Sequence, residues 1–394
     1  MTLQLRFPEF ADEWQANKLG DLANTVNGLT YSPSNIRKSG VLVLRSSNIK
    51  NGQLDFTDSI FVDENLRYNE SKKGDILICV RNGSQSLIGK NVYVDKELPK
   101  TTHGAFMSVL RSDENRFIYQ LFQTNNYKKQ VSADLGARIN SINNAQLLKY
   151  KFNFPSKPEQ EKIAEFLTAV DKRIATGEKK LELLKKYKKA VMQKIFTQSV
   201  RFKDENGNPY PEWEEKAVSG FLKERKEYTS KGGDLEHISL TTAGVVPKSE
   251  RYERDFLVGS TDKQYRITRL DDICYNPANL KFGVIARNKY KDGIFSPIYV
   301  TYVVNNADIG FVEYLVTDRD FIQRARKYEQ GTVYERMAVS PQDLAKLKVR
   351  MPSTKEQQKI ATFLTTLDAK ITAEQTHLTA AKQWKKGLLQ RMFV

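Results

Sequence analysis

Cysteine and histidine are scarce in this chain, which holds two cysteines and three histidines among 394 residues. Cys79 and Cys274 cannot build a disulfide framework, and so few histidines cannot complete zinc modules. Both cysteines follow strand-like segments, so we expect buried, reduced thiols. A Cys/His nucleophile could draw only on His103, His237 and His377, and none of them has a distinguishing sequence context.

Long hydrophobic runs are absent as well. No run of about 18 apolar residues, the length that a membrane span needs, occurs in the sequence. The first ten residues carry charge and Pro8, which is unlike a signal peptide. We therefore expect a cytoplasmic protein with no membrane partner. The hydrophobic content of 40% is enough for folded cores, and the length predicts about two or three domains.

The net charge of +16 is unevenly distributed. Residues 155–203 hold 13 basic and six acidic side chains, whereas residues 204–351 hold 23 of each. A protein that gripped DNA alone by neutralising phosphates would spread positive charge over its reading domains. The distribution therefore predicts a protein that binds a polyanion with help from partners.

The strongest signal in the sequence is an internal duplication. Residues 155–196 match residues 352–393 without gaps at an offset of 197, and 18 of these 42 positions are identical. Each copy begins with a Pro-x-x-x-Glu-Gln-x-x-Ile-Ala-x-x-Leu signature, at residues 155–167 and 352–364. Chance does not produce such a match, so the chain contains two copies of one structural unit.

Each copy also carries apolar residues at alternating spacings of four and three, which is typical of a coiled coil. We predict that the two helices pair with each other, although each could instead pack on its own domain. Lys188 and Lys385 occupy the same seam position, where a polar residue can set the register. The predicted seam is formed by Ile163, Leu167, Val170, Ile174, Leu181, Leu184, Lys188, Ile360, Leu364, Leu367, Ile371, Leu378, Lys385 and Leu388.

A fainter repeat covers the rest of the chain, since residues 6–14 resemble residues 201–213. The order is reader, helix, reader, helix, with predicted boundaries at residues 1–154, 155–200, 201–351 and 352–394. The first helix continues into residues 201–213, whereas the second ends the chain. We therefore expect a circular arrangement in which the N-terminal segment lies beside the C-terminal helix end.

The two reader segments mix strand and helix patterns separated by Asn, Gly and Ser turns. The fold class that we predict is α/β (α+β), with two globular domains separated by two long paired helices. Expected strands lie at residues 41–44, 76–80, 91–94, 107–110 and 298–304, and expected helices at residues 115–127 and 311–328.

With these residues in view, the chain resembles type I restriction specificity subunits along its full length. The duplicated signature carries the resemblance, together with residues 136–142 and residues 44–49 followed by Gly52. The resemblance implies two target-recognition domains and an antiparallel coiled coil. It implies that each domain reads one half of a split, asymmetric sequence in double-stranded DNA, while the helices set the spacer.

The resemblance also implies partners and assigns the cofactors to them. Two modification subunits would dock on the helices and methylate adenine N6 with S-adenosylmethionine. Restriction subunits would join them and use ATP and Mg²⁺. This chain would then be a non-catalytic subunit with no cofactor or metal of its own.

Candidate base-reading residues are loop side chains whose donors and acceptors match base edges. For any one of them, a solvated surface role is an equally reasonable interpretation. The candidates are Arg45, Asn48, Arg81, Asn82, Ser84, Gln85, Lys90, Thr102, His103 and Arg138 in the first reader, and Thr241, Lys248, Asn279, Lys281, Arg287, Asn288, Tyr334 and Arg336 in the second.

Two alternatives remain open at the level of sequence. The chain could be a single-chain methyltransferase or nuclease, since residues 276–279 begin like the Asn-Pro-Pro-aromatic motif of amino-methyltransferases. They lack its second proline and its aromatic residue, which would stack on a flipped base. The other alternative is a coiled-coil scaffold with no DNA specificity, which would have no need of two large, dissimilar domains.

Overall fold

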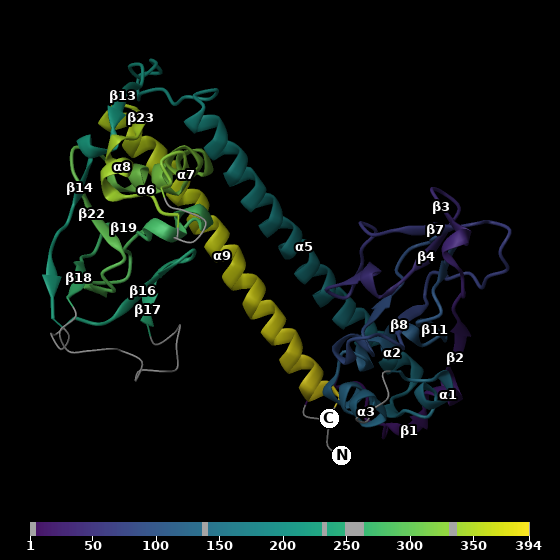
Figure 1. The fold of residues 1–394 in the computed structure, drawn as a ribbon. Helices are drawn as coiled ribbons and strands as arrows, with labels where there is room; N and C mark the ends of the chain where they lie inside the picture. Colours follow the sequence, from purple (N-terminus) through teal and green to yellow (C-terminus); the bar gives the residue numbers. More distant parts are fainter. Residues whose placement is uncertain (1–4, 136–140, 231–234, 249–263, 331–336, 394) are drawn as a thin grey trace. The chain divides into compact units, whose positions relative to one another are not determined.

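The computed structural model describes residues 5–135, 141–230, 235–248, 264–330 and 337–393. The chain forms two compact units (Figure 1). Unit 1 contains residues 1–179 and 376–394, and unit 2 contains residues 180–375. The boundaries that we predicted follow the sequence repeat, whereas the compact units cut through both long helices.

Unit 1 is built on a four-stranded antiparallel sheet of order β2-β11-β8-β9, next to a second sheet of order β10-β4-β7-β3. Its strands are β1 (Gln15–Lys18), β2 (Asn24–Asn27), β3 (Ile36–Arg37), β4 (Val41–Leu44), β5 (Ile49–Lys50), β6 (Gln53–Leu54), β7 (Ile60–Val62), β8 (Ile76–Cys79), β9 (Asn91–Tyr93), β10 (Thr101–His103), β11 (Met107–Arg111) and β12 (Lys151–Phe154). Its short helices are α1 (Leu19–Leu22), α2 (Asn115–Leu121), α3 (Asn125–Leu135) and α4 (Asn144–Leu147).

Unit 2 repeats this plan with a sheet of order β14-β22-β19-β20 and a smaller sheet of order β15-β18-β21. Its strands are β13 (Glu214–Ala217), β14 (Leu222–Glu224), β15 (Tyr228–Thr229), β16 (Ile238–Thr241), β17 (Gly244–Pro247), β18 (Tyr265–Thr268), β19 (Ile273–Tyr275), β20 (Ile285–Arg287), β21 (Gly293–Phe295), β22 (Val300–Val304) and β23 (Lys348–Met351). Its short helices are α6 (Ile309–Thr317), α7 (Arg319–Arg326) and α8 (Pro341–Lys346).

The expected strands are all present, with ends that differ by one or two residues. Each of the two expected short helices is instead a pair of helices. Residues 115–127 divide between α2 and α3, and residues 311–328 divide between α6 and α7, where Asp318 ends one helix and caps the next. Helical periodicity continues across both breaks, so it could not locate them.

The two long helices are α5 (Lys157–Phe196) and α9 (Thr354–Met392). Within each unit their segments run antiparallel. In unit 1, Asp171 pairs with Lys385 at 2.5 Å and Glu178 with Lys382 at 2.6 Å. In unit 2, Lys180 pairs with Glu374 and Lys188 with Asp368, both at 2.5 Å. Partner numbers fall along α9 as they rise along α5, so the antiparallel direction that the resemblance implied is confirmed.

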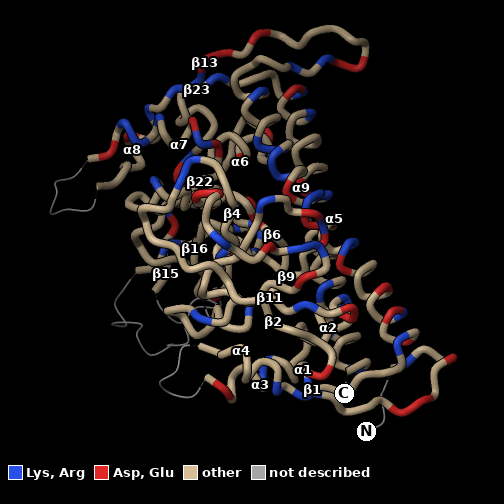
Figure 2. Tube along the Cα trace, turned by 90° about the vertical axis from the view of Figure 1, so that its right-hand side faces the viewer, with Lys and Arg blue, Asp and Glu red and all other residues tan. Residues whose placement is uncertain are grey.

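The predicted seam is buried or half-buried at every position that we named. The charges of the two seam lysines are neutralised, because each lysine forms an ion pair with an aspartate of the other helix. Asp171 and Asp368 are themselves equivalent residues of the repeat, so unit 1 and unit 2 contain the same pair with the roles of α5 and α9 exchanged. Figure 2 shows basic and acidic residues along both helices, as such pairing requires.

The seam is also part of each unit's globular core. In unit 1, Ile163 and Leu167 of α5 belong to one hydrophobic cluster with Phe117, Phe154 and Leu388. In unit 2, Ile360 and Leu364 of α9 form the equivalent cluster with Ile195, Trp213 and Phe311. Each helix therefore packs both on its partner helix and on its own domain, so both arrangements that we considered are present.

The Glu-Gln pair of the signature anchors the start of each helix. Glu159 is fully buried and accepts from Arg6 Nε at 2.8 Å and from its terminal nitrogen at 2.7 Å. Glu356 is also fully buried and accepts from the terminal nitrogen of Arg201 at 3.0 Å and from Trp213 Nε1 at 3.1 Å. The adjacent glutamines each donate Nε2 to the signature proline's carbonyl at 2.9 Å.

The circular arrangement is confirmed within unit 1. The Leu5 amide donates to the Arg391 carbonyl at 3.1 Å. The ring of Trp14 lies 6.0 Å from the ring of Phe393 and 6.1 Å from that of Phe117. The N-terminal segment thus lies against the end of α9, just as residues 201–213 follow the end of α5.

We expect Arg201→Ala to lower the free energy of unfolding of unit 2 by about 3 kcal/mol, because it leaves a buried carboxylate without its charged partner. Urea unfolding of the full chain measures this loss. The matched control is Lys216→Ala, which removes an exposed ion pair with Glu214 and should cost about 0.5 kcal/mol or less. Equal losses in the two variants would contradict the anchoring role.

Candidate nucleic-acid interface

The candidate site of unit 1 lies where β8 leaves the core. Cys79 is fully buried, and two residues later Arg81 is exposed. The Val80 and Arg81 amides donate to the Phe106 carbonyl at 3.0 and 3.1 Å. The guanidinium of Arg81 lies 5.7 Å from the centre of the Phe106 ring, within the range of a cation–π contact. Ser84 and Gln85 follow in an exposed turn.

A second turn, residues 45–48, joins this loop. Asn82 Nδ2 donates to Ser46 Oγ at 3.1 Å, and Lys90 Nζ donates to the Ser46 carbonyl at 3.5 Å. Arg45 pairs with Asp58 at 2.8 Å. The structure therefore brings together six of the predicted residues, with Phe106 beside them. We call this set the first loop cluster: Arg45, Arg81, Asn82, Ser84, Gln85, Lys90 and Phe106.

Four predicted base readers are wrong, because their side chains are fully buried. The side chain of Asn48 closes its own turn: Oδ1 accepts from the Arg45 amide, and Nδ2 donates to the Asp55 and Asp58 carbonyls. Thr102 Oγ1 donates to the Asn69 carbonyl at 2.7 Å. The other two are His103 and Asn288.

His103 Nε2 lies 2.9 Å from the Val26 carbonyl, so this nitrogen carries the proton, and Nδ1 accepts from the Ser71 hydroxyl at 3.1 Å. Burial lowers the pKa of His103 below its ordinary value of 6.5. Asn288 Nδ2 donates to the Arg269 and Lys291 carbonyls. Polar residues that hold loops together have the same residue types as base readers, so composition alone could not separate the two roles.

The candidate site of unit 2 occupies the equivalent place after β19. The Val339 amide donates to the Pro277 carbonyl at 3.2 Å, as the Ile142 amide does to Val80 in unit 1. A short 3₁₀ helix, Pro277–Phe282, follows and carries Asn279 and Lys281. It ends at Gly283, whose φ of 78° favours glycine.

Two hydrophobic residues extend this site. The side chain of Phe282 is 65% exposed, with Lys281 Nζ 5.2 Å from the ring centre. Ile298, in the turn before β22, is 57% exposed; the turn before β11 carries Phe106 at the corresponding place. The set Asn279, Lys281, Phe282 and Ile298 is the second loop cluster. Neither periodicity nor composition marked these hydrophobic residues, because their exposure depends on the turns.

The remaining candidates are dispersed. Arg287 already pairs with Asp271 at 2.7 Å and with Glu313 at 3.5 Å. Thr241 Oγ1 donates to the Gly244 carbonyl in the β16–β17 turn, and Lys248 follows β17. We therefore leave these three residues out of the second loop cluster. Arg138, Tyr334 and Arg336 lie outside the described residues.

The described residues hold no cluster of metal ligands, and both cysteine thiols are buried. No group of three His, Cys, Asp or Glu side chains among these residues could hold a metal ion. Burial raises the pKa of Cys274 to about 12 and also raises that of Cys79, so neither thiol is poised as a nucleophile. Asn276, which begins the methyltransferase-like motif, is buried and caps the 3₁₀ helix by accepting from the Ala278 amide.

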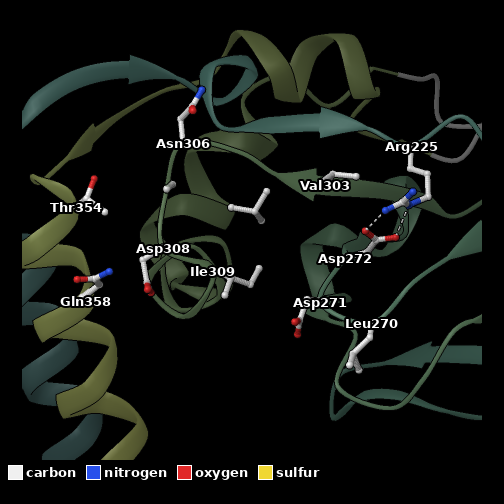
Figure 3. A pocket seen from close by; sticks show the side chains of 12 residues that line it. Arg225, Leu270, Asp271, Asp272, Val303, Asn306, Asp308, Ile309, Thr354 and Gln358 are labelled. Atoms are coloured by element: carbon white, nitrogen blue, oxygen red, sulfur yellow. Dashed lines mark hydrogen bonds and ion pairs between the residues drawn. The ribbon is translucent and has the colours of Figure 1, made fainter.

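A pocket of about 770 Å³ lies in unit 2, between the loop before α6 and the first turns of α9 (Figure 3). Arg225 and Asp272 on its wall neutralise each other in an ion pair of 2.8 Å. Asp308 caps α6, and Thr354 and Gln358 come from α9. These groups already serve the fold, and we assign the pocket no role.

Across the described residues, no helix is both long and apolar enough to traverse a bilayer.

Comparison with known proteins gives consistent results. Residues 11–186 and 284–383 match the model of the type I restriction modification DNA specificity domain. A Methanocaldococcus jannaschii protein assigned as the specificity subunit of type I enzyme MjaX is 26% identical over 416 aligned positions, covering 97% of this chain and 93% of that protein. The EcoKI specificity subunit of Escherichia coli K12 is 32% identical over 195 positions, covering 45% and 41%.

A solved structure shares the fold. The S subunit of a type I restriction-modification system from M. genitalium superimposes with a TM-score of 0.64 and 16% identity, covering 100% of this chain and 99% of that one. Two domains that mix strands and helices, and two long helices, are therefore an established architecture.

We expect the stability of unit 1 to fall as the pH drops below 6.5, the ordinary pKa of histidine. Unfolding frees His103 to take up a proton that the folded state resists, so the unfolded state gains protons and is favoured at lower pH. Urea unfolding between about pH 5.5 and 7.5 should show a shallower pH slope for His103→Gln than for the wild type. An unchanged pH slope in His103→Gln would contradict the prediction.

Proposed function

This chain belongs to the type I restriction–modification DNA specificity family, and we propose that each of its two units reads one half of a split, asymmetric DNA sequence. The observation that carries the proposal is the placement of the two loop clusters. They follow equivalent strands, β8 and β19, in two copies of one scaffold, yet their side chains differ. Equivalent frames with different contact residues are suited to reading two different half-sites.

The chemistry of the clusters supports direct readout of bases. Arg81 and Lys281 can donate to guanine, and Asn82, Gln85 and Asn279 can bond adenine in a bidentate manner. Good pairs of this kind each discriminate against a wrong base by about 1–3 kcal/mol. Phe106 and Phe282 can contact thymine methyl groups or bases in the groove. A few such contacts in each unit combine when both halves are bound.

The helices and partners complete the proposal. In it, α5 and α9 set the spacer between the half-sites and dock two modification subunits, with restriction subunits joining them. The modification subunits supply S-adenosylmethionine, and the restriction subunits supply ATP and Mg²⁺. In this proposal the partners add contacts to DNA phosphates. Residues 204–351, whose basic and acidic side chains are equal in number, therefore need no excess of positive charge.

A single-chain methyltransferase is the main competing function, and cofactor binding separates the two. We expect the isolated full chain to show no heat of binding with S-adenosylmethionine in calorimetry, and the complex with modification subunits to show it. Saturable binding by the isolated chain would favour the competing function. A scaffold without DNA specificity predicts no sequence preference in either sample.

A map of N6-methyladenine in cells that express this chain with its modification subunit tests the proposal directly. We expect one split motif that depends on this chain. Exchanging residues 1–150 for another reader should change one half of the motif and leave the other half and the spacer intact. If both halves changed together, the modular assignment would be wrong.

A further inference from the structure

The outer face of the long helices carries an exposed aromatic residue twice. Tyr187 of α5 is 51% exposed, and Trp384 of α9 is 53% exposed. The two positions are 197 residues apart, which is the offset of the sequence repeat. Each directly precedes a seam lysine, Lys188 or Lys385, so each occupies the same place beside the seam. The two units therefore present equivalent aromatic rings.

In unit 1 the ring of Trp384 belongs to a larger aromatic surface. It lies 6.2 Å from the ring of Phe166 on α5 at an angle of 81°, and Phe166 in turn lies 5.9 Å from Phe7 at 89°. Both geometries are the edge-to-face arrangement that aromatic pairs prefer. Three segments distant in sequence thus contribute to one surface. We call Phe7, Phe166 and Trp384 the first aromatic flank.

Unit 2 carries the equivalent residues, and two of them are in ring contact. Phe363 of α9 corresponds to Phe166 at the repeat offset, and its ring lies 5.5 Å from that of Phe202 at 61°. Phe202 corresponds to Phe7 in the fainter repeat. Tyr187 takes the place of Trp384, and Leu183, one helical turn earlier, is 54% exposed. Phe202, Phe363 and Tyr187 are the second aromatic flank.

Folding within the chain leaves Tyr187 and Trp384 about half exposed. The seam and the globular cores lie on other faces of the helices, and Tyr187 and Trp384 belong to neither cluster. The neighbouring exposed position differs between the two copies, because Leu183 corresponds to Ala380. Large aromatic residues at an exposed position that recurs in both copies are typical of interface anchors.

We propose that each aromatic flank is the anchor for one copy of the modification subunit, contacted through an apolar patch of that subunit. The inference rests on the proposed function and adds the residues that make the contact. One kind of surface presented twice fits one kind of partner bound twice. A truncated anchor in one unit should then release one copy and leave the other bound.

Two equivalent lysines, one beside Phe7 and one beside Phe202, already have partners within the chain. Lys162, whose ammonium lies 5.1 Å from the Phe7 ring, is ion-paired with Glu9. Its counterpart Lys359 donates to the Lys203 carbonyl at 2.7 Å. Binding to duplex DNA relies on cations that neutralise phosphates, and both of these lysines already have partners. Removing the aromatic rings from water can therefore contribute more binding free energy at the flanks than pairing these two lysines with phosphates.

The test measures how many modification subunits the full chain binds, by native mass spectrometry with a titration for affinity. We expect two copies for the wild type, one for Trp384→Ala, one for Tyr187→Ala and none for the double variant. Loss of an aromatic anchor should weaken the affected site by about 30-fold. The copy that stays bound in each single variant shows that the chain is folded.

Two controls accompany these variants. Trp384→Phe keeps an aromatic ring and should retain two copies. Leu270→Ala removes an apolar side chain of similar exposure, 54%, in the turn before β19, and should also retain two copies with unchanged affinity.

Each failure has a distinct meaning. A wild-type chain that binds no modification subunit would refute the proposed function. A wild type and all variants that bind two copies with equal affinity would overturn the aromatic anchors alone. A change in self-association or DNA affinity, with modification-subunit binding unaltered, would overturn them as well and identify another chain copy or DNA as the occupant.

Discussion

A buried carboxylate at the start of each long helix is the constraint on which each unit depends. Glu159 and Glu356 are fully out of contact with solvent, where an unpaired charge would be costly. Each is satisfied by an arginine from a segment more than 150 residues away along the chain. The pair therefore ties that segment to the helix start, and the helix start to the β1–β12 or β13–β23 pair beside it.

The seam ion pairs constrain the middle of each helix pair in a similar way. Asp171 and Asp368 each accept from a seam lysine and also from the adjacent recognition domain, through Gln120 Nε2 at 3.2 Å and the Tyr314 hydroxyl at 2.7 Å. A shift of register would break both bonds at once. Register, domain packing and helix direction are thus coupled in each unit, which a scaffold for precise loop placement requires.

The repeat also shows how one fold accommodates different readers. The strand orders β2-β11-β8-β9 and β14-β22-β19-β20 are equivalent, while the loops that follow β8 and β19 differ in length and in residue type. The central strands β8, β11 and β19 are buried along almost their whole length, so their packing maintains the sheet whatever the loops contain. Side chains can therefore change at the tips without cost to the core, and the aromatic flanks remain the same on the helices.

The sequence by itself determined the duplication, the two long helices, their seam residues and the family, because those features are local patterns with a fixed period. It also supplied six members of the first loop cluster, which remain predicted base readers. Only the tertiary structure decided that Asn48, Thr102, His103 and Asn288 are buried, and that Phe106 and Phe282 are exposed. Helix direction is likewise invisible in heptads, because apolar spacing reads the same both ways. Whether a loop residue is buried or exposed depends on which distant segment of the chain packs over it, and local sequence patterns carry no information about such contacts.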